Sequence, residues 1–447
     1  MTVVVRSGTA PGPSPRAGLP SAPPQRPGDG GLGPVPHRLR RAAERAPVAG
    51  LYLLVVATTV LQRIVVPGTV VFVALPVAFL VVGALAVRGH IVADVPRTLA
   101  YIGAVALCGT ATLVATAEGE VESSLTSLAL LAVIYLPCCG RLTPGLRRRF
   151  PDVLEFFQRL MCLAALVCVG QYVAQLGGWT FDDLLGFLPS NIIASTVEYN
   201  LSYPVSYGSQ IYKSNGIVFL EASFCSQFLA MAIIVQILLG RSYWRIALLA
   251  VGLATTFSGT GVVLLGAGLL VLALRRGGRW AARAALAVVV AVVAVSFTPA
   301  GELLADRSTE TVQEGSSGYI RFVAPYELVL SSVPADTSAL LAGRGPGSIS
   351  RDVEFFNPND VEANYPAIPK LFGEYGLPAM LVFLAFLLML FLRGAPSPTL
   401  GLMAALLFFV LSSALLTAPI VYFAWLISGL FASAGPAGET GRGRGAR

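Results

Sequence analysis

Long apolar runs separated by short polar stretches fill the chain from about residue 48 to residue 434. A helix needs about 20 apolar residues to cross a hydrocarbon layer of roughly 30 Å, or slightly fewer where the layer is thinned. The pattern predicts twelve spans, of which the seventh and eighth are short and joined only by SGTG (258–261). The predicted spans lie at about 48–62, 66–87, 98–117, 124–139, 153–176, 218–239, 243–257, 259–274, 281–298, 371–392, 398–416 and 418–434.

Composition agrees with this pattern, because 55% of the residues are hydrophobic and only 12% are charged, unlike a soluble globular protein. The sequence therefore predicts an all-α, polytopic membrane protein with a transmembrane domain over 48–434. Residues 1–47 and 435–447 are rich in Pro, Gly and Arg and are expected to be disordered cytoplasmic tails. Because 1–47 has no signal-peptide h-region, the first span is expected to serve as an uncleaved signal anchor.

The arginines predict the orientation of the spans. They cluster in every second connection, which by the positive-inside rule places both termini in the cytoplasm. The formal net charge of +7 is thus explained by topology, and no basic patch interleaved with aromatics indicates nucleic-acid binding. The longest polar insert, 299–370, is predicted to lie outside, between the ninth and tenth spans. Apolar periodicity over 319–333 predicts an amphipathic helix in this loop, on the membrane surface.

Basic residues on the predicted outer side are the exceptions to this charge distribution. Arg63 follows the first span and is either a snorkelling anchor or one arm of an anion site. Arg321 lies on the amphipathic segment, where it would face a diphosphate or pair with Glu327. Arg344 stands among glycines, in a plain turn or in a loop whose amides approach an anion. The outer basic residues are Arg63, Lys213, Arg307, Arg321, Arg344, Arg351 and Lys370.

Two acidic residues stand where apolar spans begin. Glu221 opens the sixth span and Glu374 the tenth; each is either a functional carboxylate or a helix N-terminal group that binds free amides. No histidine falls on the outer side, and the six cysteines lack metal-ligand spacing. The sequence therefore predicts neither a metal site nor a cofactor, and a base on the outer side would have to be a carboxylate.

Over about residues 50–430 the chain resembles the O-antigen ligase and O-antigen polymerase superfamily, multispan glycosyltransferases that use polyprenyl-diphosphate-linked glycans. The resemblance implies a bacterial cytoplasmic-membrane protein, with donor diphosphate contacts at Arg63 and Arg321, joined by Lys213 and Arg344. Its motifs here are LQRIVVPG (61–68), SNGIVFLEASFCSQFLA (214–230), TTFSGTGVVLLG (255–266), SSGYIRFVAPYELV (316–329), LLAGRGPGS (340–348) and NYPAIPKLFGEYGLPAMLVF (364–383).

One departure from the family's pattern bears on whether this protein is a ligase or a polymerase. Where the family usually has a His-Asn pair before Glu-x-Gly, this chain has Ala363 and Asn364 before Glu374. Because ligases need that histidine, we expect an inverting, metal-independent polysaccharide polymerase on the outer membrane face. Its catalytic residues would be Arg321, Glu221 and Glu374. Its partners would be a lipid-linked oligosaccharide, membrane lipid and a chain-length regulator.

Three other functions are kept as alternatives at this stage. A ligase would transfer a finished glycan to a lipid or protein. A transporter or flippase of lipid-linked glycans would typically show inverted repeats and discontinuous helices near the midplane, which the sequence does not reveal. A structural or sensory membrane protein is the default if the outer arginines are dispensable.

Overall fold

The structure is a computed structural model, and it describes residues 37–119, 123–194, 199, 201–205, 208–240, 242–276 and 317–433. The predicted ninth span (281–298), the start of the predicted outer loop (299–316) and most of both predicted tails lie outside the described residues. The twelve-span count and the placement of that loop therefore stay predictions.

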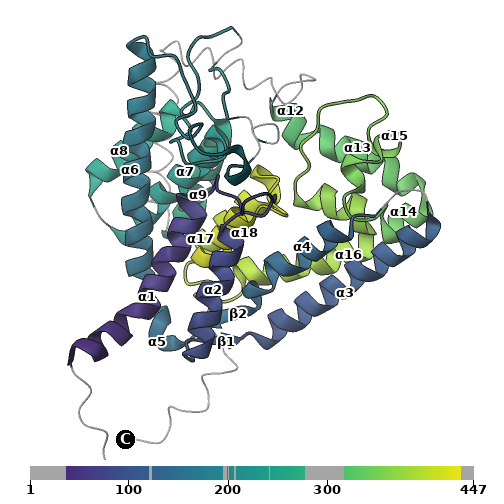
Figure 1. The fold of residues 1–447 in the computed structure, drawn as a ribbon, viewed down its shortest axis with the longest axis horizontal. Coiled ribbons are helices and arrows are strands. Elements are labelled where there is room, and N and C mark those ends of the chain that lie inside the picture. The colour runs from purple at the N-terminus through teal and green to yellow at the C-terminus, as the bar shows by residue number, and fades with distance from the viewer. Residues whose placement is uncertain are drawn as a thin grey trace, which may run out of the picture. The chain divides into compact units, whose positions relative to one another are not determined.

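Most of the regular structure is helical, which confirms the predicted class (Figure 1). One short antiparallel sheet joins β1 (Ile91–Ala93) to β2 (Gly140–Leu142), with Val92 opposite Arg141. The α-helices are α1 (His37–Thr59), α2 (Ala74–Val87), α3 (Val95–Glu118), α4 (Leu125–Tyr135), α5 (Pro144–Arg147), α6 (Phe150–Leu176), α7 (Ala222–Leu239), α8 (Tyr243–Thr255), α9 (Gly259–Arg276), α12 (Ser317–Phe322), α13 (Ala324–Ser332), α14 (Thr337–Ala342), α15 (Val353–Phe356), α16 (Ala367–Leu392), α17 (Pro398–Leu406) and α18 (Ala418–Ile427).

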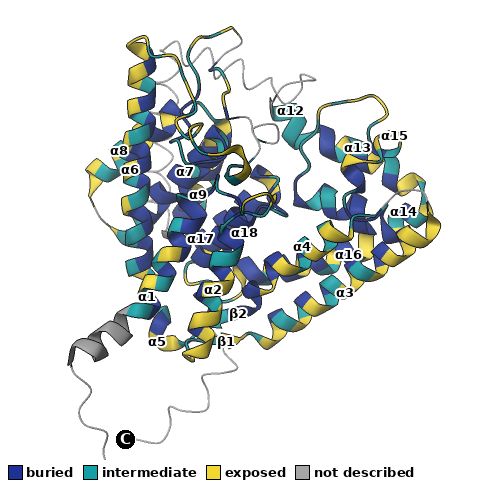
Figure 2. Cartoon of the chain, in the orientation of Figure 1, coloured by how far each residue is buried: buried dark blue, intermediate teal, exposed yellow. Residues whose placement is uncertain are grey.

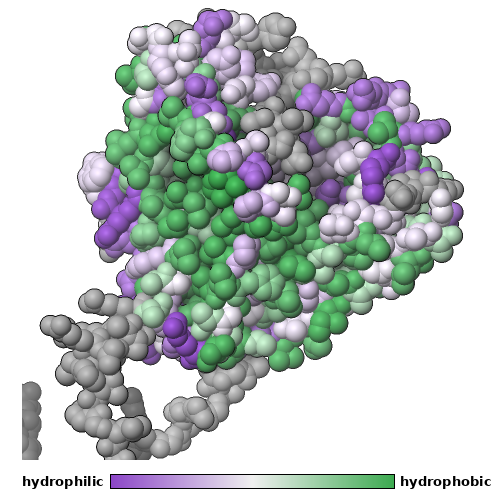
Figure 3. All heavy atoms as spheres, viewed as in Figure 1, coloured by the Kyte–Doolittle hydropathy of each residue, from purple (hydrophilic) through white to green (hydrophobic). Residues whose placement is uncertain are grey.

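Four of the helices that the structure describes are long and apolar enough to cross a membrane: α3, α6, α7 and α16. Large apolar side chains on α3 and α6 remain exposed, among them Leu113 (72%) and Leu163 (59%), and exposed stripes run along α3 in Figure 2. The face seen in Figure 3 carries a broad hydrophobic area. Exposed apolar surface of this extent fits contact with lipid, so the chain is an integral membrane protein.

The predicted spans 398–416 and 418–434 are shorter in the structure and form a hairpin. The apolar helix Pro398–Leu411, whose end Leu407–Leu411 is π-helical, is about 21 Å long at 1.5 Å per residue. The ten residues of α18 extend about 15 Å, about half the hydrocarbon thickness. The two ends of the hairpin meet, because the Ser433 N–H donates to the Gly394 carbonyl at 2.8 Å.

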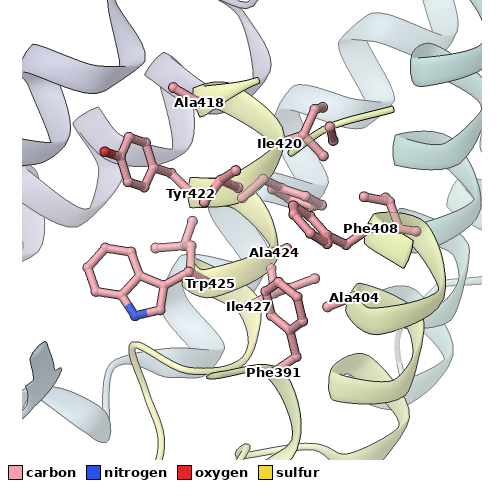
Figure 4. Packing of buried hydrophobic residues seen from close by; sticks show 14 of the residues in the cluster. Phe391, Ala404, Phe408, Ala418, Ile420, Tyr422, Ala424, Trp425 and Ile427 are labelled. Atoms are coloured by element: carbon pink, nitrogen blue, oxygen red, sulfur yellow. The ribbon is translucent and has the colours of Figure 1, made fainter. Parts of the chain in front are cut away.

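The interior of the hairpin is densely packed. Side chains of α18 are buried on every face, and Figure 4 shows Tyr422 and Trp425 on one side of it and Ile420 facing Phe408 on the other. A helix that is apolar all round has to be enclosed by protein or lipid, and here protein encloses it. At the hairpin tip, residues 412–417, four side chains line a cavity: Ser412, Ser413, Leu416 and Thr417.

Arg97 joins the base of the hairpin to α3. It lies in the connection between the predicted second and third spans, yet the residue is only 2% exposed. Its Nη1 donates to the carbonyl oxygens of Cys138 (3.3 Å), Gly140 (3.4 Å) and Gly429 (3.1 Å). A guanidinium is well suited to this position because it offers several donors in a fixed plane.

A break in α16 receives the glycine-rich loop that follows α14. Gly376 has a left-handed φ of +73°, and such a break leaves backbone groups without helical partners. The amides of Arg344 and Gly345 donate to the carbonyls of Gly373 and Glu374, each at 3.0 Å. The glycines of this loop therefore allow close packing, and the backbone amides of Arg344 and Gly345 are bonded to protein carbonyls.

An ion pair fixes the connections that follow α1 and α6. The Arg63 guanidinium is 2% exposed and donates to both carboxylate oxygens of Asp183, at 2.7 and 2.5 Å, and to the Ile217 carbonyl at 3.0 Å. The Arg63 hydrogen bonds hold the pKa of the Asp183 carboxyl below its usual range. This two-pronged geometry is the strong form of an Arg–carboxylate contact.

Replacing Gly343 with alanine is expected to destabilise the protein. The new Cβ would lie 2.4 Å from the carbonyl carbon of Glu374, at a residue with φ +68°, a combination that costs of order 1–3 kcal/mol. Gly83→Ala is the matched control, because no atom lies within 4 Å of its added Cβ. Thermal unfolding in detergent should show a lower Tm for Gly343→Ala and an unchanged or higher Tm for Gly83→Ala; equal Tm values would contradict the packing described.

Asp183→Asn is expected to lower stability at neutral pH by removing the charge that Arg63 binds. Since the folded state lowers the pKa of Asp183, its contribution is present above the unfolded pKa of about 4 and is lost as the pH falls through the folded value. The Tm difference between wild type and Asp183→Asn should therefore shrink between pH 7 and about pH 3. The control Glu354→Gln, at an exposed site on α15, should show no such trend.

Candidate functional site

A cavity of about 430 Å³ collects polar residues from distant parts of the chain. The end of α12, the residues before α16 and the hairpin tip contribute to it, together with Glu221 before α7. Its polar or charged lining residues are Tyr199, Glu221, Arg321, Ser350, Asn364, Tyr365, Lys370, Ser412, Ser413 and Thr417. Among the pockets of the described chain, this one contains two sequence-predicted site residues, Glu221 and Arg321.

Glu221 and Arg321 form an ion pair in this cavity, 100 residues apart in the chain. The Arg321 Nη2 lies 2.5 Å from the Glu221 Oε2, which also accepts from the Ser223 hydroxyl at 2.6 Å. The side chains of Arg321 and Glu221 are 18% and 8% exposed, respectively. Both charges are therefore largely withdrawn from water, and each depends on the other as its partner. Both charges nevertheless remain at the cavity surface.

The structure gives neither residue the partner that its alternative interpretation predicts. Glu221 is the N-cap residue of α7, yet its side chain makes no capping hydrogen bond. Glu327, the alternative partner of Arg321, accepts instead from the Tyr319 hydroxyl at 2.8 Å. The prediction of a single helix over 319–333 is also refined, because Val323 separates α12 from α13.

Lys370 provides a second cation in the cavity. It forms an ion pair with Glu374, which lies outside the cavity lining. The Lys370 Nζ lies 3.2 Å from the Glu374 Oε1, with the two side chains 21% and 1% exposed. From the sequence, Lys370 was predicted only to be a basic residue on the outer side; its i, i+4 spacing to Glu374 was the signal that identifies the pair.

The hairpin tip and Tyr365 supply neutral hydrogen-bonding groups that the sequence analysis missed. Ser412, Ser413 and Thr417 line the cavity, in the SSALLT stretch (412–417) where two apolar runs meet. Burial raises the pKa of the Tyr365 phenol, which keeps it protonated and able to donate at neutral pH. The polar interruption between two apolar runs was the available signal.

The other predicted diphosphate contacts lie elsewhere. Arg63 is held by Asp183, and the Lys213 Nζ lies 4.2 Å from the centroid of the Tyr203 ring. The Arg344 Nε donates to Asp352 at 3.1 Å, and its Nη1 lies 3.6 Å from an Asp336 oxygen. Of the four basic residues assigned to the diphosphate from the sequence, only Arg321 lines the cavity with Glu221.

The position of the missing histidine also falls on this cavity. Ala363 and Asn364 both line it. The backbone N–H of Asn364 donates to the carbonyl of Ile320, the residue before Arg321, at 2.9 Å. The position at which the resemblance would place a histidine therefore carries a methyl side chain on the cavity wall. Glu221 is the one carboxylate among the described lining residues.

The described residues indicate what this cavity can bind. Two cations from different elements face a space that also holds one carboxylate and several hydroxyl groups, an arrangement suited to an anion next to a reacting hydroxyl. Within the described part of the chain, no group of three or more His, Cys, Asp or Glu side chains is placed to hold a metal ion.

Comparison with known proteins adds the family. The sequence model of the WcaD colanic acid polymerase family matches residues 50–343, a stretch that contains Arg63, Glu221 and Arg321. No curated protein matches the chain significantly. The family match agrees with the resemblance to O-antigen polymerases and covers more than half of the sequence. The chain belongs to the WcaD colanic acid polymerase family.

Proposed function

We propose that this protein polymerises a cell-surface polysaccharide in the cavity that holds Glu221, Arg321 and Lys370. It would transfer a glycan from a polyprenyl-diphosphate donor to a lipid-linked acceptor, on the outer face of the cytoplasmic membrane. The observation that carries the proposal is the meeting of two cations and one carboxylate on the lining of a single cavity. The family, whose substrates are lipid-linked oligosaccharides, supports it.

In this proposal Arg321 and Lys370 bind the diphosphate. Breaking the bond between sugar and phosphate adds negative charge to the leaving group, and fixed cations stabilise that charge without a metal ion. Arg321 offers a planar fork of donors and Lys370 a compact charge. Glu374 acts as a positioning residue, because it holds Lys370 at 3.2 Å from outside the cavity.

Glu221 is the proposed general base. When a diphosphate takes over Arg321, the Glu221 carboxylate loses its partner and becomes free to accept a proton. The acceptor hydroxyl would lose its proton to Glu221 while its oxygen attacks the anomeric carbon. The bond from that carbon to the phosphate oxygen breaks, and its electron pair leaves with the diphosphate. A single displacement of this kind inverts the anomeric configuration.

The basic residues at the base of the α17–α18 hairpin support an outward-facing cavity. The Arg147 Nη1 donates to the Ala432 carbonyl at 3.2 Å, and Arg97 binds the Gly429 carbonyl. Arg393 precedes Gly394 at the same end of the hairpin. By the positive-inside rule this basic end faces the cytoplasm, so the hairpin tip and the cavity would lie toward the other side.

Purified protein supplied only with lipid-linked repeat units tests the proposed reaction. A polymerase elongates these units, giving a ladder of longer lipid-linked glycans. Products that form only when a chemically different acceptor is added would identify a ligase instead. Movement of the units across sealed vesicles with no new glycosidic bond would identify a flippase.

Arg321→Ala is expected to abolish elongation in this assay while expression stays normal. Loss of one positioned charge-stabilising donor costs about 10²–10³ in kcat, and the variant also leaves Glu221 without its partner. Arg159→Ala is the control, because Arg159 is 67% exposed in a simple pair with Glu155 on α6, and it should elongate normally. A wild-type product ladder from Arg321→Ala would remove this residue from the mechanism.

Glu221→Gln is expected to lower kcat by about 10²–10⁴, the usual effect of removing a general base. Its binding of pyrophosphate should be unchanged or tighter, because no carboxylate competes for Arg321. The control Glu327→Gln changes an exposed acid on α13 and should leave kcat unchanged. Normal turnover in Glu221→Gln would contradict the assignment. A variant that loses both turnover and pyrophosphate binding would contradict it as well.

A further inference from the structure

A second cavity adjoins the first one. It measures about 700 Å³ and is lined by the segment after α1, from Val65 to Phe72, and by the segment 183–194 after α6. Val70 and Phe72 line both cavities. The two cavities are therefore neighbours that share these two residues.

Backbone hydrogen bonds fix the two walls of this second cavity. The Val65 amide donates to the Ile192 carbonyl at 2.9 Å, and the Gly68 amide donates to the Asn191 carbonyl at 3.0 Å. The partly buried pair of Arg63 and Asp183 ties the same two segments together. The cavity is thus a built feature of the fold, in the size range of ligand pockets, about 300–1,000 Å³.

Its chemistry differs from that of the first cavity. The described residues that line it include no lysine or arginine, and its one carboxylate, Asp183, is already bound by Arg63. Neutral polar groups come from Thr69, Ser190 and Asn191, beside the apolar side chains of Val65, Leu188 and Ile193. Such a mixture suits hydroxyl groups and C–H surfaces, and it offers nothing to a diphosphate.

An aromatic pair stands at the junction of the two cavities. The rings of Phe72 and Tyr199 have centroids 6.3 Å apart at an interplanar angle of 69°, and Tyr199 lines the first cavity. Aromatic faces are rigid apolar surfaces, and Tyr adds a polar end. A sugar bonded to a diphosphate in the first cavity would reach this pair first.

We propose that the second cavity binds the saccharide portion of the lipid-linked substrate whose diphosphate occupies the first cavity. The inference rests on the proposed function for the position of the diphosphate. The first cavity supplies the charge that the leaving group needs, and the second supplies the neutral contacts that hold the sugars in register. Discrimination between glycans then belongs to those residues of segments 65–72 and 183–194 that line the second cavity.

Two probes separate the two cavities in the purified, detergent-solubilised full chain. One is inorganic pyrophosphate, and the other is the oligosaccharide released by mild acid from the polyprenyl-linked pool of the host. Ser190→Trp places a large side chain in the second cavity and should weaken oligosaccharide binding at least tenfold while pyrophosphate binds as in wild type. Asn191→Ala should weaken the oligosaccharide severalfold without adding bulk. The matched control is Leu184→Trp, at a 47% exposed position of the same segment that does not line the cavity.

The outcomes distinguish this inference from the proposed function. Wild-type oligosaccharide affinity in both Ser190→Trp and Asn191→Ala overturns the saccharide site, because two independent changes of its lining would have had no effect. A Ser190→Trp variant that loses pyrophosphate binding as well has disturbed the fold, and Asn191→Ala then decides. Pyrophosphate binding that survives in Arg321→Ala and in Lys370→Ala counts against the proposed function alone.

Discussion

A charge or a free backbone group that is withdrawn from water must find its partner inside the protein, and this constraint organises the whole structure. Glu221 is 8% exposed on its side chain and is matched by Arg321 at 2.5 Å. Arg97, 2% exposed, is satisfied by three backbone carbonyls. The carbonyls freed at the break in α16 are taken by amides of the glycine-rich loop.

The same constraint explains why the site lies where helices are interrupted. Irregular backbone at membrane depth is tolerated where it is buried in protein or lines a polar cavity. The turn between α17 and α18 is irregular, and it carries the hydroxyls of Ser412, Ser413 and Thr417 to the cavity. Just before α16, Asn364 binds the backbone of Ile320, which joins a third remote segment to the same place.

Two Arg–carboxylate pairs show how the same contact serves different ends. The pair of Arg63 and Asp183 closes two loops and uses the guanidinium also on the Ile217 carbonyl, so little of it remains for a ligand. Arg321 stays at the surface of a cavity that holds a second cation, Lys370. In the proposed reaction, a substrate anion exchanges with Glu221 for Arg321, and the exchange releases the carboxylate that the reaction needs.

The sequence by itself determined the helical membrane architecture, because long apolar runs can be satisfied in lipid only as helices. It also pointed to Glu221 as an acid at the start of an apolar run, and to Arg321 as a basic residue on the predicted outer side. Only the tertiary structure decided which charges meet: it gave Arg63 and Arg344 to carboxylates away from the cavity and brought Lys370 into it. Hydropathy and charge are local properties of a sequence, whereas the partner of a buried charge can lie 100 residues away and is selected by packing.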